Sequence, residues 1–338
     1  MFSYLQNLFS LFGFSITFLW KHTFQLKFIE KTLGKEIEEA KLTNDGSLDE
    51  KDFKKIKSVY GYTIPVLLGE PFSHLRGKSM TIKERSCLTY LGGLTGLFDD
   101  FVDEDQLEES YIRNLVSNSK IEEGCNSNEK LFLNFMNKAL DFSEDPDQLR
   151  AASTNIFNAQ IQSKKQLNNN TSTQELEDII YNKGGYSFLF YRSGFKEPIS
   201  NSEWQVHYHF GSLGQFENDL FDIYKDYTDG IHTLATRSEN IAALRRIFNE
   251  KIQYAVSLVH KTDYPYKNKI KYIRFLSIFL CSGFVCLDML AKLEQKDKPF
   301  NVSDYIRKQL ICDMEKPLNF LKALHYFCKM NPNHPRSL

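Results

Sequence analysis

Long segments with the apolar spacing of amphipathic helices make up most of this 338-residue chain, and proline and glycine lie mainly between them. We find no convincing run of alternating polar and apolar residues with a hairpin signal, so strands are not expected. The segments predicted to be helical are 2–34, 49–68, 81–106, 107–117, 128–142, 146–167, 173–195, 201–229, 237–261, 266–295 and 301–330. The sequence therefore predicts one all-α domain.

The composition is typical of a globular protein and argues against nucleic-acid binding. Hydrophobic residues make up 42% of the chain, enough for a sizeable core, and the formal net charge is −1. The long basic stretches that bind a phosphate backbone are missing, so no nucleic acid is expected as a partner. The six cysteines contain no CxxC pair, which favours free thiols in a reducing compartment such as the cytoplasm.

The first 20 residues carry no charged side chain and are rich in phenylalanine and leucine. Polar residues such as Gln6 and Asn7 interrupt the apolar run, and no basic segment precedes it. It is therefore neither a plain transmembrane span nor a signal peptide. We expect residues 1–48 to form a helical extension packed on a domain of residues 49–338. The alternative is an interfacial helix, with residues 1–20 making a peripheral contact with a membrane.

Two acidic clusters, separated by more than a hundred residues, each lie in an apolar helical stretch. One spans Asp99–Glu104, with the sequence DDFVDE, and the other runs from Asn218 to Asp226. Residues four apart share a face of an α-helix, so Asp99 and Asp103 point the same way, as do Asn218, Asp222 and Asp226. Oxygen donors on two facing helices suit Mg²⁺, which often bridges carboxylates to substrate phosphates. The predicted metal ligands are Asp99, Asp100, Asp103, Asn218, Asp222 and Asp226.

The alternative for each cluster is a solvated acidic helix end. Residues 90–98 and 210–216, which precede the two clusters, are uncharged and contain glycines. The acidic groups thus emerge from segments expected to be buried, where an unpaired charge is costly. A bound cation removes that cost, so we favour a metal site whose substrate is a diphosphate ester.

The face of the second cluster continues backwards along the same predicted helix, by steps of three and four residues. Glycine on this face lets a neighbouring helix or a ligand approach closely, and aromatic rings there stabilise a carbocation through their quadrupoles. An aromatic stripe at helical spacing is also common in plain cores, which is the alternative. The predicted cavity residues are Trp204, His207, Tyr208, Gly211 and Gln215.

These motifs resemble those of the class I isoprenoid synthases, and most closely the squalene and phytoene synthase branch. The DDIVDE-like first motif of that branch matches residues 99–104. Its second motif, QxxNxxxDxxxDxxxGxxxL, matches Gln215, Asn218, Asp222, Asp226, Gly230 and Leu234. The second face is also similar to the NDxxSxxxE motif of terpene cyclases, with Asp222 and Asp226 in place of the serine and the glutamate. The resemblance covers roughly residues 70–235.

The resemblance implies a helical bundle around an apolar cavity, with the two acidic clusters facing each other at its mouth. Three Mg²⁺ ions would hold the diphosphate of a prenyl substrate there and draw it off, leaving an allylic carbocation. Basic side chains should assist, although each candidate could equally be an ordinary surface cation. The candidates are Arg76, Lys78, Lys183, Arg192 and Lys225.

The chain departs from the family in its arginines. Squalene and phytoene synthases usually place one shortly before the first motif and another after the glycine of the second, where this chain has Leu94–Phe98 and Ile231-His232. Fewer cations bind fewer diphosphates, which favours a one-substrate terpene synthase that cyclises or eliminates. The alternatives are a condensing synthase that joins two prenyl diphosphates and a non-catalytic isoprenoid-binding protein. A homodimer is compatible with each.

Overall fold

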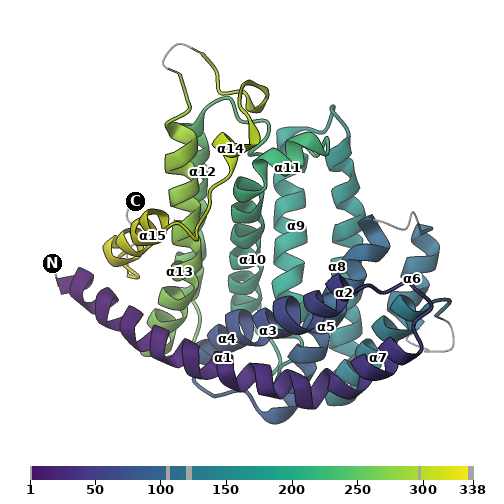
Figure 1. Cartoon of the computed structure of the whole chain (residues 1–338). Coiled ribbons are helices and arrows are strands. Elements are labelled where there is room, and N and C mark those ends of the chain that lie inside the picture. The colour runs from purple at the N-terminus through teal and green to yellow at the C-terminus, as the bar shows by residue number, and fades with distance from the viewer. Residues whose placement is uncertain (1, 104–106, 119–123, 296–297, 334–338) are drawn as a thin grey trace. The chain divides into compact units, whose positions relative to one another are not determined.

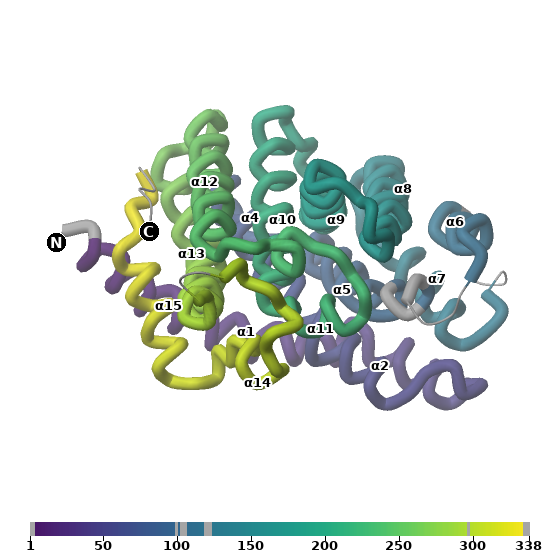
Figure 2. Tube along the Cα trace, turned by 90° about the horizontal axis from the view of Figure 1, so that it is seen from above, coloured from purple at the N-terminus to yellow at the C-terminus, as the bar shows by residue number. Residues whose placement is uncertain are grey.

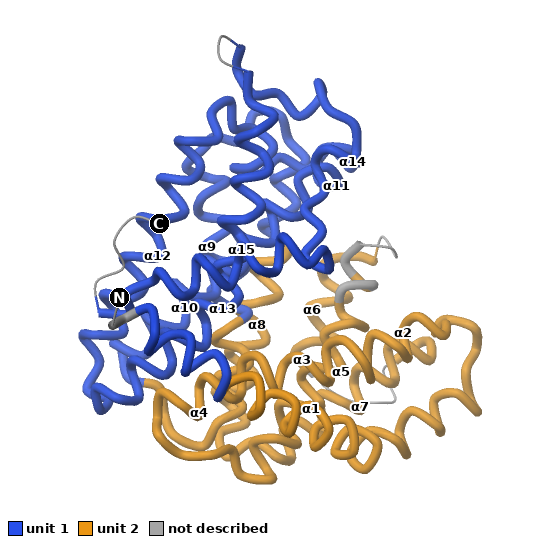
Figure 3. The backbone as a smooth tube through the Cα atoms, turned by 60° about the vertical axis from the view of Figure 1, so that its left-hand side comes forward, with its two compact units in different colours: residues 1–13, 162–187, 200–338 blue, residues 14–161, 188–199 orange. Residues whose placement is uncertain are grey.

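The computed structural model describes residues 2–103, 107–118, 124–295 and 298–333, and this part of the chain contains helices and no strands (Figure 1). The all-α prediction is therefore confirmed over these residues. The chain divides into two compact units (Figure 3). Unit 1 comprises residues 1–13, 162–187 and 200–338, and unit 2 comprises residues 14–161 and 188–199. Residue 48, the predicted end of an N-terminal extension, lies inside unit 2.

Unit 2 is built around α5 (Ile82–Asp103), which packs along α7 (Ser127–Phe142). Leu88, Leu91 and Leu97 on α5 are fully buried. Burial of each such side chain contributes roughly 1.5–3 kcal/mol relative to exposure. The uncharged segment before the first acidic cluster is thus a core helix, as the sequence predicted. The unit also contains α6 (Glu109–Asn118) and most of α8 (Pro146–Ser163).

The segment predicted as one helix over residues 49–68 alternates between α- and π-helical turns. It comprises α2 (Glu50–Lys54), the π-helix η1 (Lys55–Tyr60), α3 (Gly61–Thr63) and the π-helix η2 (Ile64–Gly69), and the chain continues directly into α4 (Glu70–Arg76). Pro65 has no N–H to donate to the carbonyl of Gly61, and that carbonyl instead accepts a 3.1 Å bond from the buried Gln25 amide of α1 (Phe2–Leu42). The wider turn of η2 therefore coincides with a proline that the helical pattern concealed.

Unit 1 is a group of long helices that run alongside one another, as Figures 1 and 2 show. Helix α10 packs on α12 and α13, and α13 packs on α15. Phe216, Phe248 and Phe284 meet edge to face in its core, with ring centroids 5.2–5.6 Å apart. Its main helices are α9 (Thr173–Arg192, to residue 187), α10 (Asn201–Phe221), α12 (Ile241–His260), α13 (Tyr266–Ala291) and α15 (Pro317–Lys329).

Helix α13 is long and apolar enough to cross a membrane by length and composition, but 67% of its most apolar window is buried inside the protein. The helix packs against α10, α12 and α15 within unit 1. Its hydrophobicity is therefore accounted for by its position in the core of that unit.

Two other predicted helices are interrupted. The helix predicted over 301–330 is a 3₁₀ turn (Val302–Asp304), a short α14 (Arg307–Leu310) and then α15, because Pro317 fits only the first turn of a helix. The helix predicted over 201–229 bends at Asp222, which separates α10 from α11 (Ile223–Thr228).

The predicted packing of the N-terminal helix is correct for only part of α1. Leu33 and Ile37 in its second half are buried, whereas large side chains in its first half, such as Phe9 and Phe12, are exposed. The burial expected for residues 1–20 is therefore wrong for most of their apolar side chains. In this half it is the polar Asn7 that is buried.

Candidate functional site

The second acidic motif keeps its helical spacing through the bend at Asp222. The amide of Asp222 donates to the carbonyl of Asn218, and the amide of Asp226 donates to the carbonyl of Asp222, both at 2.8 Å. The side-chain amide of Asn218 also donates to the Asp222 carboxylate at 3.2 Å. The three predicted ligands therefore still follow one another at one-turn intervals, as the sequence indicated.

Gly230 and Leu234, the last two positions of this motif, have structural roles. Gly230 adopts φ +71°, the left-handed conformation that ends α11, and the next amide, of Ile231, returns to the carbonyl of Asp226 at 2.7 Å. Leu234 is buried. This cap ties the end of α11 to Asp226, which fixes the backbone of that ligand candidate.

Asp219 was not among the predicted site residues, yet it is the most strongly perturbed acid of the motif. It is only 2% exposed, and one carboxylate oxygen accepts a 2.8 Å bond from Gln215. Its other oxygen, Oδ2, has no hydrogen-bond partner among the described residues. Burial raises the pKa of Asp219 to about 7, and Asp226 and Asp222 add to the rise, while the Gln215 bond and Lys183 oppose it. An acidic residue four positions after Gln215, one helical turn from it, was the available signal.

Asp226 is likewise buried and electrostatically strained. Its pKa is raised to about 6, first by burial and then by the Asp222 carboxylate, against the effects of Lys225 and Lys183. Lys183 therefore lies close enough to both Asp219 and Asp226 to lower their pKa values. We use the name acidic group for Asp219, Asp222 and Asp226 together with the neighbouring Lys183 and Asn218. A cation added among these carboxylates would relieve their repulsion.

A close helix crossing brings Lys183 to the motif. A methyl group on Gly184 of α9 would lie 2.2 Å from the carbonyl oxygen of Gly211 on α10, and one on Gly211 would lie 2.1 Å from that of Gly184. Gln215 packs against the same point, 2.8 Å from the methyl position of Gly184. The predicted close approach at Gly211 is thus an approach between two helix backbones.

The predicted cavity residues separate into two environments. Trp204 and Tyr208 are half-buried and stack with ring centroids 4.7 Å apart, and the Tyr208 hydroxyl donates to Asn182 at 2.7 Å. Burial is the main reason that the pKa of Tyr208 rises to about 12. His207 instead is fully buried, with Nδ1 3.1 Å from the Tyr272 hydroxyl of α13 and Nε2 3.1 Å from Glu203. Its position is that of a core histidine with two partners.

Three of the five candidate cations belong to a network within unit 2. Arg76 binds Glu84 through two hydrogen bonds of 2.6 and 2.7 Å and also pairs with Glu197, which accepts a further bond from Lys78 at 3.2 Å. Arg192 donates to the backbone carbonyl of Glu197 at 3.0 Å. These side chains have protein partners that account for their positions.

The remaining candidate, Lys225, is exposed on α11 and pairs with Asp229, four residues on, at 3.1 Å. Among the described residues, Lys183 is therefore the candidate cation that forms no ion pair, and its charge acts on the buried aspartates.

The first acidic motif lies at the carboxyl end of α5, in unit 2. The backbone of Asp99, Asp100 and Asp103 is helical, while their side chains, like all of Glu104, lie outside the described residues. The preceding Leu97 and the intervening Phe101 are buried.

Within the described part of the chain, no three His, Cys, Asp or Glu side chains are already gathered as a metal site. The donors of the second motif nevertheless fit Mg²⁺ chemically, because they are one amide oxygen and carboxylates, all hard ligands. A positive charge beside these groups would pair with the orphaned Oδ2 of Asp219 and offset the effects that raise the pKa of Asp226. The residues present therefore fit the ion that the resemblance implies.

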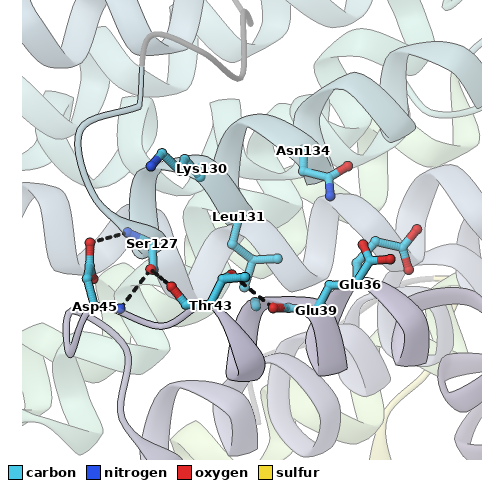
Figure 4. Close-up of a pocket in the computed structure, with 9 residues that line it drawn as sticks. Glu36, Glu39, Thr43, Asp45, Ser127, Lys130, Leu131 and Asn134 are labelled. Carbon is cyan, nitrogen blue, oxygen red and sulfur yellow. Dashed lines mark hydrogen bonds between the residues drawn. The ribbon is translucent and has the colours of Figure 1, made fainter.

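A pocket of about 370 Å³ in unit 2 is lined by Glu36, Glu39, Asp45 and Ser127, among others (Figure 4). Its polar groups largely serve the chain turn after α1. The amide of Ser127 donates to Asp45 at 3.1 Å, and the Ser127 hydroxyl donates to the carbonyl of Thr43 at 3.3 Å. These contacts join α7 to the loop, so we assign the pocket a structural role.

Comparison with protein-family models, with curated proteins and with solved structures gave no match to this chain.

Proposed function

We propose that the protein is a Mg²⁺-dependent class I terpene synthase that ionises a linear prenyl diphosphate and releases a cyclised or eliminated terpene and diphosphate. The observation that carries the proposal is the acidic group of unit 1, in which burial and the nearby Asp222 carboxylate raise the pKa values of the buried Asp219 and Asp226 beside Lys183. Natural proteins rarely bury unpaired carboxylates unless the arrangement serves a ligand. The motif resemblance supplies the identity of that ligand.

Each residue of the acidic group has a role in this proposal. Asn218, Asp222 and Asp226 hold magnesium through their oxygen atoms, and the resemblance adds Asp99, Asp100 and Asp103 as ligands from the first motif. The bound metal supplies Lewis acidity to the departing diphosphate. Lys183 binds the diphosphate oxygens and stabilises the negative charge that they gain as the diphosphate leaves. Gln215 holds one oxygen of Asp219 in place through its 2.8 Å bond.

The aromatic side chains beside the helix crossing support an apolar binding pocket. Tyr208 stacks on Trp204 and meets Tyr186 edge to face at 5.5 Å, and Gly185 leaves space for the Tyr208 ring. Electron-rich ring faces stabilise a cation that water would otherwise quench. We propose that these rings lie along the isoprenoid chain.

The distribution of cations favours one diphosphate over two. Arg76, Lys78 and Arg192 have their partners within unit 2, and Lys225 pairs with Asp229. Binding two diphosphate esters requires more free positive charge than Lys183 provides. A condensing synthase of the squalene and phytoene type is the second candidate, supported by the six matched positions of the second motif.

The test is incubation of the purified protein with farnesyl, geranylgeranyl and longer prenyl diphosphates, with and without Mg²⁺, followed by assay of diphosphate and mass spectrometry of extracted products. We expect Mg²⁺-dependent release and a product with the carbon number of the substrate. A product of doubled carbon number would identify the condensing synthase. No release from any chain length would contradict catalysis and favour an isoprenoid-binding protein.

Two aspartate variants make this assay specific. Asp226→Asn removes a proposed ligand, whereas Asp229→Asn makes the same change three residues later, at the exposed end of α11. Loss of release in the first variant and retention in the second is the expected pattern. Equal activity in both would contradict the assignment of Asp226.

A further inference from the structure

Three segments of unit 1 are free of acidic residues. Residues 1–13, 264–287 and 316–333 together contain seven lysines and arginines and no aspartate or glutamate, in a chain whose totals are 42 basic and 43 acidic residues. Because the chain as a whole is balanced, the positive charge of these segments is local. It favours a negatively charged partner on this part of unit 1.

These segments meet at the start of α1. The buried side chain of Asn7 donates to the carbonyls of Phe327 at 3.1 Å and Met330 at 2.6 Å, at the end of α15, and accepts a 3.1 Å bond from Arg274 of α13. Figures 1 and 2 both show the N-terminus beside α15. The first turns of α1 are thus clamped to unit 1 through a polar side chain.

The apolar side chains of these turns are left exposed. Leu5, Leu8, Phe9 and Phe12 follow one another at steps of three, one and three residues, which places them on one face of the helix. Phe9 is 76% exposed and Phe12 is 70% exposed. We call these four side chains the apolar stripe. An exposed stripe of this kind on a clamped helix marks a surface that another apolar phase covers.

A groove of about 910 Å³ runs beside the apolar stripe, and its lining combines aromatic, polar and basic side chains. Phe9 lines it from α1, and Tyr266, Lys267 and Arg274 line it from α13. Lys271, one turn after Lys267, is also exposed. We call Lys267, Lys271 and Arg274 the basic rim.

We propose that the apolar stripe and the basic rim bind the surface of an anionic lipid bilayer. An uncharged apolar helix face with phenylalanines enters the acyl boundary, and flanking lysines and arginines contact lipid phosphates. The stripe continues along α1 with the exposed Ile16, Leu19 and Trp20, so its length suits a helix that lies in the membrane plane. A partner protein that bound this helix in a groove would be expected to contact a shorter set of apolar side chains. This proposal does not depend on the proposed reaction.

The test is co-sedimentation of the full-length protein with phosphatidylcholine vesicles, with and without about one third phosphatidylglycerol. The protein should sediment with the anionic vesicles, and the emission of Trp20 should shift to shorter wavelength as its ring leaves water. Absence of binding to anionic vesicles would overturn the proposal. A second result would also overturn it: the free protein self-associates, the Phe9→Ser, Phe12→Ser variant does not, and neither protein binds vesicles. The apolar stripe would then be covered by a second copy of the chain.

Matched variants test the two parts of the surface separately. The Phe9→Ser, Phe12→Ser double variant should lose about tenfold or more in vesicle partitioning, whereas Leu42→Ser, at the other end of α1 and 86% exposed, should not. Lys267→Glu with Lys271→Glu should lose about tenfold on anionic vesicles, and the same changes at the exposed Arg307 and Lys308 should have little effect. All four proteins should keep the circular dichroism and melting temperature of the wild type. If either double variant of the apolar stripe or the basic rim binds vesicles as well as its control variant does, that part of the proposed membrane-binding surface is contradicted.

Discussion

Glu84 in unit 2 and Asp219 in unit 1 are equally buried, at 2% exposure, and yet their environments are opposite. Glu84 accepts hydrogen bonds from Arg76 and from the amides of Thr81 and Lys196, and these outweigh its burial and lower its pKa to about 2. Asp219 has one amide donor and one orphaned oxygen, and its pKa rises to about 7. All the charge of the first carboxylate is paired within the protein, whereas the second has no ion pair among the described residues and one oxygen without a hydrogen-bond partner, which is typical of a ligand site.

The largest effect should come from removing a charge that serves only the ligand. Asp226→Asn should lower Mg²⁺-dependent diphosphate release by about 10³-fold, because it removes a group that acts on the developing charge. The variant should melt no lower than the wild type, since the lost carboxylate was buried beside Asp222. Steady-state release assays and thermal melts check both parts. A lower melting temperature of Asp226→Asn would show that Asp226 stabilises the fold, as Glu84 does, and would contradict a role confined to the ligand.

Replacing Glu84, whose carboxylate is fully paired, should instead lower the stability of the fold. Glu84→Gln leaves the buried Arg76 guanidinium incompletely paired and should lower the free energy of unfolding by about 3–5 kcal/mol. Glu144→Gln breaks the exposed 3.7 Å pair with Lys83 and should cost about 1 kcal/mol or less. Urea denaturation of both variants measures the difference. Similar midpoints for the two variants would contradict the structural role of the Arg76 network.

The stabilisation by Glu84 should depend on pH. Its pKa lies below the usual value of 4.5 in the folded protein, so the unfolded chain binds more protons between pH 4.5 and about 2. The contribution of Glu84 is therefore complete above pH 4.5 and is lost as the pH falls to about 2. Urea midpoints of wild type and Glu84→Gln should converge over that range. A constant difference would show that the charge of Glu84 is not what stabilises the fold.

The helix crossing beside Asp219 offers a geometric test. Gly184→Ala places a methyl group against the Gly211 backbone and should destabilise the protein by about 1–3 kcal/mol, while it displaces Lys183 and Gln215. Gly13→Ala on α1, where no atom lies within 4 Å of the new methyl group, is the control and should be neutral or stabilising. Differential scanning calorimetry compares them. A Gly184→Ala protein as stable as the wild type would mean that the two helices do not touch.

The smallest effect should come from Asp219→Asn. Above pH 7 the wild-type carboxylate is charged and buried, so its neutral replacement should raise the free energy of unfolding by about 1 kcal/mol in the absence of metal. Asp229→Asn, on the exposed end of α11, should leave it unchanged. Urea denaturation at pH 8 makes the comparison. Destabilisation by Asp219→Asn would show that Oδ2 has a structural partner, as the oxygens of Glu84 do.

The sequence predicted the helical class and the spacing of the second motif because both depend on local periodicity. The bend at Asp222 preserves the amide bonds to residues 218 and 226, so one-turn spacing survived it. The π-helical turns before α4 were missed. Pro65 in η2 was visible in the sequence, but Gln25, which donates to the Gly61 carbonyl in place of the missing proline N–H, comes from a distant segment. The division into two interleaved units is also a property of long-range contacts, which periodicity does not reveal.

Single side chains were harder to predict than helices. Neighbouring residues point about 100° apart on a helix, so His207 and Tyr208 enter different surroundings although they are adjacent. Arg76 was a reasonable diphosphate ligand by charge alone, but Glu84, its partner, lies eight residues on and across a turn. Asp219 became visible only when its burial and its unpartnered oxygen were known.

The most direct measurement is a thermal melt of the wild type, Asp226→Asn and Asp229→Asn with Mg²⁺ and inorganic diphosphate, separately and together. A ligand that binds only the folded state stabilises it, by about 2.7 kcal/mol at a hundred times its Kd. The acidic group should give a rise in melting temperature for wild type and Asp229→Asn when both ligands are present, and none for Asp226→Asn. No rise in the wild type, or an equal rise in Asp226→Asn, would contradict the claim that these buried aspartates form a metal–diphosphate site.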